Sequence, residues 1–100
     1  MKIFITGGTG FIGKQLVPIL EKHELLCLSH STKDWVPFQN VQLVSGDLSN
    51  PETYISKLQK FEPDCCIHIA WHGLPNYSVE NNMINLTSSI NLVECLKKVG

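Results

Sequence analysis

The sequence has neither a concentration of positive charge nor a long hydrophobic run. Its 100 residues carry a formal net charge of -1, and the 8 Lys and Arg residues are spread along the chain. Proteins that bind nucleic acid or an anionic membrane electrostatically present a basic face, so neither partner is expected. No stretch could form a transmembrane helix, and Gly7, Gly8 and Gly10 interrupt the amino-terminal apolar run before a signal-peptide core can form. We therefore expect a cytoplasmic protein whose partner is a small molecule.

The cysteines lack the spacing of a metal site or a redox motif, because no C-x-x-C pair exists. Three of the 4 lie inside apolar runs: Cys27, Cys65 and Cys66. Free thiols in such runs usually pack as small hydrophobic side chains, so we expect reduced, buried cysteines, with a disulfide or a metal cluster as the alternative. His68 and His72 have the spacing of a zinc pair, but Ile69 replaces the glutamate of the zinc motif, and no metal site is predicted.

What the sequence does contain is a regular alternation of two patterns. Short apolar runs predict buried parallel strands at residues 2–6, 25–28, 41–44 and 65–70. Helical periodicity predicts helices at residues 11–20, from Ser49 to a stop at Pro63, and from Val79 to Gly100. This alternation predicts an α/β fold, a Rossmann-type doubly wound parallel sheet that is incomplete and comprises its first four strands and their helices.

The predicted elements carry several local signals. Pro18 predicts a bend in the first helix because it lacks a backbone donor. Ser49-Asn50-Pro51-Glu52 offers the second helix a capping side chain, an early proline and an early acid. The inner face of that helix is predicted to consist of Ile55, Leu58 and Phe61. Residues 65–70 hardly alternate, which predicts burial on both faces. In the last helix, apolar residues recur every three or four positions, namely Val79, Met83, Leu86, Ile90, Val93 and Leu96.

A glycine-rich turn joins the first predicted strand to the first predicted helix. Gly7, Gly10 and Gly13 are each three residues apart. Residues without Cβ let the chain turn tightly, let a pyrophosphate approach the backbone, and let the helix cross close to the strand. The free N–H groups of Phe11 and Ile12 would then meet the phosphates.

An ordinary glycine turn and a P-loop are the alternatives. Gly8-x-x-x-x-Gly13-Lys14 fits most of the P-loop motif. However, Gln15 occupies the place of the Ser or Thr whose hydroxyl binds magnesium, which argues against a nucleotide triphosphatase.

These motifs resemble those of the extended short-chain dehydrogenase/reductase family, the NAD-dependent epimerase/dehydratase group. The family's TGxxGxxG motif is matched by residues 6–13, its Asp-hydrophobic pair by Asp47-Leu48, and its His-x-Ala strand end by residues 68–70. Its N-x-x-G-T-x-N-L-x-E helix is approximated by Asn85, Ser88, Ser89, Asn91, Leu92 and Glu94. The resemblance covers nearly all of the chain and implies that residues 1–100 are the amino-terminal part of an NAD(P)-binding Rossmann domain.

The resemblance implies cofactor contacts at each motif: pyrophosphate at the glycine turn, adenine at Asp47, and nicotinamide near residues 69–71 and Asn85. The cofactor-binding residues expected in all are Gly7, Gly10, Phe11, Ile12, Gly13, Ser29, His30, Lys33, Asp47, Leu48, Ile69, Ala70, Trp71 and Asn85. Two plainer alternatives stay open, in which Asp47 caps its own turn and Asn85 is a solvated helix position. Trp71 and Ser88 depart from the family's usual small residue and glycine, which narrows the space beside the nicotinamide ribose.

The end of the second predicted strand bears on the choice between NADP and NAD. An Asp or Glu there would bind the ribose hydroxyls of NAD and repel the extra phosphate of NADP. Ser29 and His30 occupy this position instead, and Asp34 falls beyond the strand. Lys33, Lys14 and His30 would add positive charge near that phosphate, so NADP is favoured; the alternative is that all three side chains are simply solvated.

The chain lacks the proton-transfer pair that the family uses, a Tyr followed four positions later by Lys. Tyr54 and Tyr77 are followed at that distance by Leu58 and Asn81. We therefore assign no catalytic residue, and expect the chain to be the cofactor half of a longer reductase, epimerase or dehydratase and to be inactive alone.

The substrate and the partners follow only from resemblance. Residues 68–77 faintly resemble sugar-nucleotide reductases of polysaccharide synthesis, which suggests a nucleotide sugar as the substrate. A sheet edge exposed by the absence of later strands also predicts either self-association, as a homo-oligomer, or marginal folding. The alternatives to an enzyme are a non-catalytic dinucleotide sensor of the same fold and a structural remnant that binds nothing.

Overall fold

The computed structural model describes residues 1–8, 11–29, 39–70 and 78–99. Its strands are β1 (Lys2–Thr6), β2 (Glu24–Ser29), β3 (Val41–Ser45) and β4 (Cys65–His68). Its α-helices are α1 (Phe11–Leu16), α2 (Ile55–Phe61) and α3 (Val79–Val99), and two short 3-10 helices cover Val17–Leu20 and Pro51–Thr53.

The four strands form one parallel sheet in the order β3-β2-β1-β4. β1 pairs with β2 on one side, with Ile3 opposite Leu25, and with β4 on the other, with Ile5 opposite Ile67. β3 extends the sheet beyond β2, also in parallel. The predicted parallel, doubly wound sheet is therefore confirmed.

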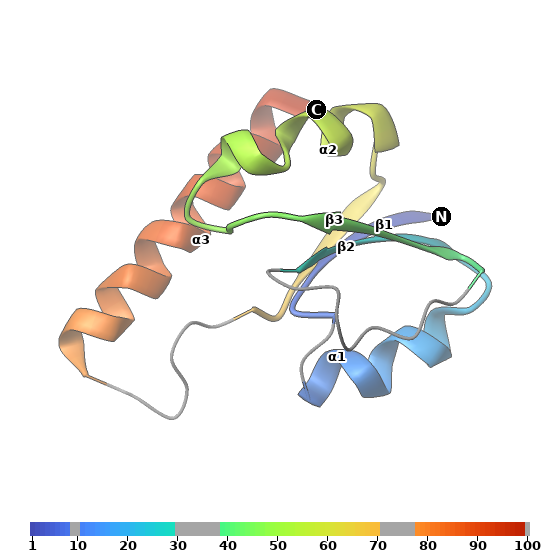
Figure 1. The fold of residues 1–100 in the computed structure, drawn as a ribbon, viewed down its shortest axis with the longest axis horizontal. Coiled ribbons are helices and arrows are strands. Elements are labelled where there is room, and N and C mark those ends of the chain that lie inside the picture. Colours follow the sequence, from blue (N-terminus) through green and yellow to red (C-terminus); the bar gives the residue numbers. More distant parts are fainter. Residues whose placement is uncertain (9–10, 30–38, 71–77, 100) are drawn as a thin grey trace.

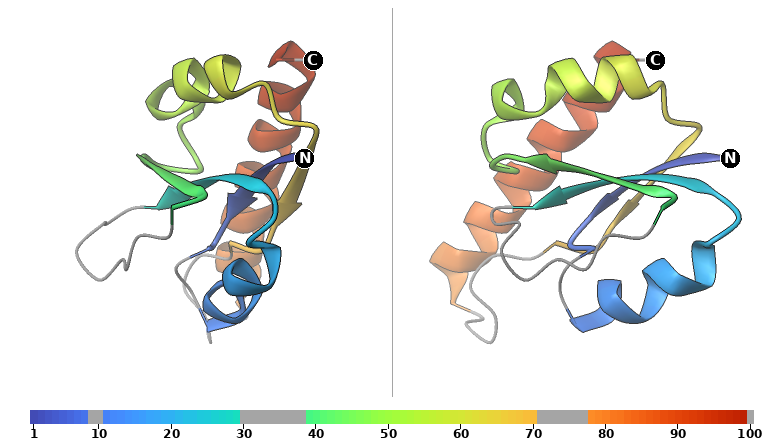
Figure 2. Two further views of the ribbon diagram at one scale, coloured as in Figure 1. Left: turned by 90° about the vertical axis from the view of Figure 1, so that its right-hand side faces the viewer. Right: turned by 45° about the vertical axis from the view of Figure 1, so that its right-hand side comes forward.

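Helices cover both faces of the sheet (Figure 1, Figure 2). One core contains Phe4 and Leu26 from the sheet together with Leu58 of α2 and Leu92 of α3. The other core contains Ile5, Leu25 and Cys27 of the sheet with Val17 of the 3-10 helix that follows α1. This division places α2 and α3 on one face and α1 on the other, which is the three-layer arrangement that parallel sheets require for burial.

The helix boundaries differ in detail from the sequence signals. The predicted bend at Pro18 takes the form of a change from α1 to the 3-10 helix, in which Pro18 lies in the first turn. The second helix also begins as a 3-10 turn, and Asn50 makes no side-chain capping bond, so the predicted cap is absent there. The predicted inner face of α2 is correct, since Leu58 and Phe61 are buried and Ile55 is partly buried.

The prediction that residues 65–70 are buried on both faces was wrong. Cys65 and His68 are exposed, Cys66 and Ile67 are half-buried, and the strand ends at His68. Among the described strands, β4 has a partner on one side only, and the sheet edge it forms admits solvent. The expectation of buried cysteines therefore holds for Cys27 and Cys95 and fails for Cys65, while all four thiols are free.

The face that α3 turns toward the sheet is also unexpected. The long helix is confirmed, but most residues of its apolar pattern are about half exposed or more: Val79, Met83, Leu86, Ile90 and Val93. The buried residues lie on the opposite side of the helix: Asn81, Asn85, Ser88, Leu92 and Cys95. No helix in the described part of the chain combines the length and the hydrophobicity needed to cross a membrane.

Leu92 and Val93 provide a neighbouring pair that tests this orientation. Leu92 is 2% exposed and Val93 is 54% exposed. We expect Leu92→Ala to lower the free energy of unfolding by about 2–5 kcal/mol, because it leaves a cavity between α3 and the sheet. Val93→Ala should change it by no more than about 0.5 kcal/mol. Denaturant titration measures both values, and a larger loss for Val93→Ala would contradict the orientation of α3.

Candidate cofactor-binding site

The order of the strands reverses between β1 and β4, which creates a switch point at the carboxyl ends of these two strands. From β1 the chain moves outward to β2 and β3, then crosses back to place β4 on the opposite side of β1. In open α/β sheets, ligands bind in the crevice outside the carboxyl ends of the strands at such a switch point. The residues at this switch point are Thr6, which ends β1, Gly7, which follows it, and Ile69 and Ala70, which follow β4.

Gly7 is adapted to this crowded position by its lack of a side chain. Its φ of +77° lies in the left-handed region, which favours glycine. A Cβ on Gly7 would lie 2.7 Å from the backbone nitrogen of Ala70. The turn after β1 therefore packs directly against the segment that follows β4.

Gly13 meets the same turn from α1. A Cβ on Gly13 would lie 2.2 Å from the carbonyl oxygen of Gly7 and 2.5 Å from the Cα of Gly8. Only a residue without a side chain lets α1 begin this close to the end of β1, which is the spacing that the glycine pattern predicted. Beside it on α1, the Ile12 side chain is 61% exposed, so its predicted contribution is limited to its backbone.

A network of hydrogen bonds joins β1, β4 and α3 beside the crevice. The fully buried Thr6 hydroxyl oxygen Oγ1 accepts from the backbone N–H groups of Ile69, at 3.1 Å, and Ala70, at 3.2 Å. The Ile69 N–H also reaches the Thr6 carbonyl oxygen, at 3.1 Å. The same Oγ1 lies 2.5 Å from Nδ1 of His68, and Nε2 of His68 lies 2.9 Å from the Ser89 hydroxyl on α3.

All residues of this network belong to the sequence motifs described above, but the motifs did not predict the hydrogen bonds between them. Thr6, His68 and Ser89 each belong to a separate motif, and 62 residues separate the first two. The available signal was that Thr6 ends one apolar run and His68 lies near the end of another, and that both runs were predicted to be parallel strands. Residues at the carboxyl ends of neighbouring parallel strands lie at one edge of the sheet.

Asp47 and Leu48 follow β3 on this same edge. One carboxylate oxygen of Asp47 accepts two hydrogen bonds from Ser49, one from its backbone N–H at 2.9 Å and one from its side-chain hydroxyl at 2.7 Å. The plainer alternative, in which Asp47 caps its own turn, is therefore present in the structure. The adenine contact at Asp47 stays a prediction beside this cap.

Ser29 and Asn85 are both buried near the carboxyl edge. Ser29 ends β2 and is 7% exposed, and Asn85 on α3 is 2% exposed. The Asn85 amide donates to the Asn81 carbonyl one turn earlier, at 3.0 Å. The alternative of a solvated Asn85 was therefore wrong. Four further predicted site residues, Gly10, His30, Lys33 and Trp71, lie outside the described residues, as does the side chain of Phe11.

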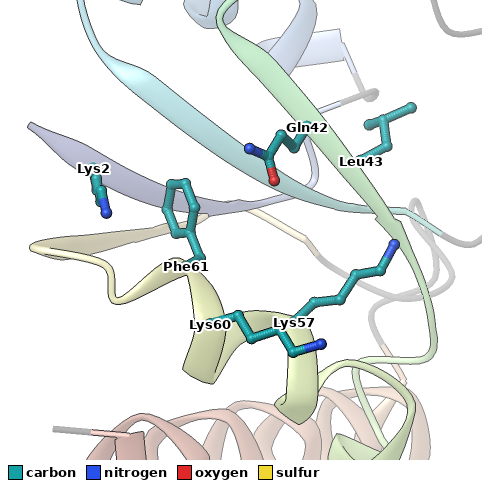
Figure 3. Close-up of a pocket in the computed structure, with 6 residues that line it drawn as sticks. All are labelled: Lys2, Gln42, Leu43, Lys57, Lys60 and Phe61. Carbon is teal, nitrogen blue, oxygen red and sulfur yellow. The ribbon is translucent and has the colours of Figure 1, made fainter.

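A separate hollow of about 300 Å³ lies away from this crevice, where α2 approaches the sheet (Figure 3). Its lining residues are Lys2, Gln42, Leu43, Lys57, Lys60 and Phe61. Lys2 and Gln42 lie near the amino ends of β1 and β3, whereas the glycine turn follows the carboxyl end of β1. The hollow is therefore remote from the switch point and is not part of the candidate site.

Comparison with known proteins agrees with the arrangement of the fold. Protein Rcp of Vibrio cholerae is 34% identical over 97 residues, which is 90% of this chain and 47% of that protein. CDP-paratose 2-epimerase of Salmonella typhi is 27% identical over 112 residues, covering 98% of this chain and 33% of that protein. The chain thus spans a third to a half of the length of these relatives.

A solved structure and a family description cover the chain almost completely. The structure of Thermus thermophilus UDP-glucose 4-epimerase in complex with NAD superposes with a TM-score of 0.80 and 27% identity, over 100% of this chain and 35% of that one. The sequence description of the NAD dependent epimerase/dehydratase family matches residues 3–100. The chain belongs to the NAD dependent epimerase/dehydratase family.

Proposed function

We propose that this chain binds the dinucleotide NAD(P) across the carboxyl ends of β1 and β4, as the cofactor-binding part of an enzyme that acts on a nucleotide sugar. The observation that carries the proposal is the close packing at the switch point. A Cβ on Gly7 or Gly13 would overlap backbone atoms of the neighbouring segments. Such bare backbone is what a pyrophosphate needs for close approach.

The cofactor would supply hydride transfer, and the residues of this chain would bind and orient it. Gly7, Gly10 and Gly13, with the N–H groups of Phe11 and Ile12, would hold the pyrophosphate. Asp47 and Leu48 would contact the adenine, and residues 69–71 with Asn85 would border the nicotinamide. The NAD in the epimerase complex from Thermus thermophilus supports a dinucleotide as the ligand.

Substitutions of two glycines in the same turn distinguish an effect on cofactor binding from a general effect on stability. Gly13→Ala should weaken NAD(P) binding about tenfold or more, because its Cβ would push α1 off the turn. Gly8→Ala is the matched control, since its Cβ would meet only side chains, the nearest being Cys27 Sγ at 3.0 Å.

Isothermal titration with NAD and NADP measures both effects, and circular dichroism verifies that each variant is folded. Equal cofactor affinity of folded Gly13→Ala and the unchanged protein would contradict the proposed pyrophosphate site.

Within this proposal, NADP is the preferred cofactor. Ser29 ends β2 with a small buried side chain where a carboxylate would repel the extra phosphate of NADP. His30 and Lys33 follow it in the sequence and offer positive charge. One hydrogen bond from a cation to the phosphate would contribute about 1.5–3 kcal/mol, which corresponds to a preference of roughly tenfold or more.

The double variant His30→Ala, Lys33→Ala tests the preference for NADP. We expect it to lose roughly tenfold in NADP affinity while its NAD affinity changes little, because only NADP carries the extra phosphate. Lys22→Ala is a control that removes an exposed charge elsewhere. Tighter binding of NAD than of NADP by the unchanged protein, or an unchanged NADP affinity in the double variant, would contradict this preference.

The nucleotide-sugar substrate and the reaction are inferred from relatives. CDP-paratose 2-epimerase and UDP-glucose 4-epimerase both act on sugars linked to a nucleoside diphosphate, as their names state. The described residues supply no tyrosine for proton transfer. Tyr54 is 1% exposed, its hydroxyl donates to the Leu48 carbonyl at 3.4 Å, and burial raises its pKa to about 12.

The variant Tyr54→Phe therefore tests whether Tyr54 has a structural or a catalytic role. In the protein expressed from its complete coding sequence, we expect kcat with a nucleotide sugar to stay within about twofold of its original value, a barrier change below about 0.5 kcal/mol. The loss of one hydrogen bond should lower the stability by about 0.5–1.5 kcal/mol. A kcat that falls by two orders of magnitude in a folded variant would show that Tyr54 transfers a proton.

A further inference from the structure

The Thr6 hydroxyl determines which nitrogen of His68 carries a proton. A threonine hydroxyl can donate one hydrogen bond and accept two. Its Oγ1 accepts from the N–H groups of Ile69 and Ala70, which can only donate. Since Thr6 is fully buried, its own O–H has to find a protein acceptor, and Nδ1 of His68 lies 2.5 Å away. The O–H of Thr6 therefore donates to Nδ1, which is unprotonated.

The second ring nitrogen of His68, Nε2, then has to carry the proton. A neutral imidazole carries a single N–H, so an unprotonated Nδ1 places the proton on Nε2. Nε2 lies 2.9 Å from the Ser89 hydroxyl and donates to it. His68 thus connects the buried end of β1 to α3 as one defined tautomer.

We propose that His68 is a positioning residue for the cofactor-binding crevice, active only as the neutral tautomer that accepts from Thr6 and donates to Ser89. It acts through the Thr6 hydroxyl, which holds the backbone of Ile69 and Ala70. That backbone packs against Gly7, where a Cβ would lie 2.7 Å from the Ala70 nitrogen. The inference rests on the proposed function in one respect, namely that this crevice binds the dinucleotide.

Protonation of His68 is incompatible with this arrangement. A protonated ring would direct a third N–H at the Thr6 oxygen and leave the Thr6 O–H without its acceptor. Partial burial of the ring also lowers the pKa of His68, which disfavours the charged form. Because the folded pKa lies below the ordinary value of about 6.5, the arrangement is stable above that value and is lost as the pH falls through the lowered pKa.

Among the described residues packed on this face, His68 is the group that titrates between neutral and mildly acidic pH. β4 contributes Cys66 and α3 contributes Cys95, both in contact with the same core. Burial raises the pKa of both thiols, that of Cys66 to about 11, so they stay neutral from neutral to acidic pH. β1 contributes Phe4 and Thr6, which do not ionise in this range.

The tautomer can be read directly from the ring-nitrogen chemical shifts of His68, measured by NMR on the protein expressed from its complete coding sequence. Near neutral pH we expect an unprotonated Nδ1 and a protonated Nε2. Thr6→Ser keeps the hydroxyl and should keep this pattern, whereas Thr6→Val keeps the shape but should lose it. A proton on Nδ1 in the unchanged protein would overturn the proposal, even if Thr6→Val does not fold.

Titration with NAD then tests the coupling to the cofactor. NAD is the probe because it lacks the extra phosphate of NADP, which itself titrates in this range. As the pH falls from about 7.5 through the lowered pKa of His68, followed by the same ring-nitrogen shifts, the dissociation constant of NAD should rise about fivefold to tenfold in the unchanged protein, the effect of losing about one hydrogen bond. In His68→Asn, which cannot take up a proton, it should change by less than about twofold over the same range.

Three results have distinct meanings. The same pH dependence in both proteins would overturn the coupling of His68 to the crevice, whatever the tautomer. A pH dependence confined to the unchanged protein would support it. The absence of NAD binding at every pH would contradict the proposed function and this coupling together, and the ring-nitrogen shifts would still establish whether the Thr6–His68–Ser89 arrangement exists.

Discussion

The contact between α1 and the end of β1 is the constraint on which the rest of the candidate site depends. A Cβ on Gly13 would lie 2.2 Å from the Gly7 carbonyl oxygen, which is far inside van der Waals contact. Only glycine therefore lets the helix begin beside the strand end, and only glycine at position 7 lets the segment after β4 approach the same turn. Three chain segments therefore meet at backbone distance: the turn after β1, the beginning of α1 and the segment after β4.

The order of strands and helices could be predicted because each parallel strand is a short apolar run. The segments that became β1 and β2 are covered by helices on both faces, so their interior positions, residues 3–5 and 25–28, are all apolar. The same reasoning failed for Cys65, because an apolar sequence does not reveal whether a strand lies at the centre or at the edge of a sheet. Burial at an edge depends on whether a neighbour is present, which is a property of the sheet and not of the strand.

The candidate site was predicted where its residues are close in sequence and missed where they are distant. The glycine turn could be inferred from three residues with fixed spacing. The bond between Thr6 and His68 crosses 62 residues, and its geometry depends on the register that pairs these two residues across β1 and β4. Sequence patterns identify the ends of strands, whereas register decides which side chains meet there.

The unexpected orientation of α3 follows from the position of the site. Along its buried face, the first half of the helix presents Asn81, Asn85 and Ser88, and the second half presents Leu92 and Cys95. Ser89, midway along, bonds to His68 at the carboxyl end of β4, so the polar half lies toward the switch point and the apolar half lies over the core. Buried polar groups need hydrogen-bond partners, and the Asn85 amide finds one in the Asn81 carbonyl of the same helix. Hydrophobic periodicity alone would bury the other stripe of this helix, whereas the bond between Ser89 and His68 and the packing of Leu92 and Cys95 in the core turn the observed face toward the sheet.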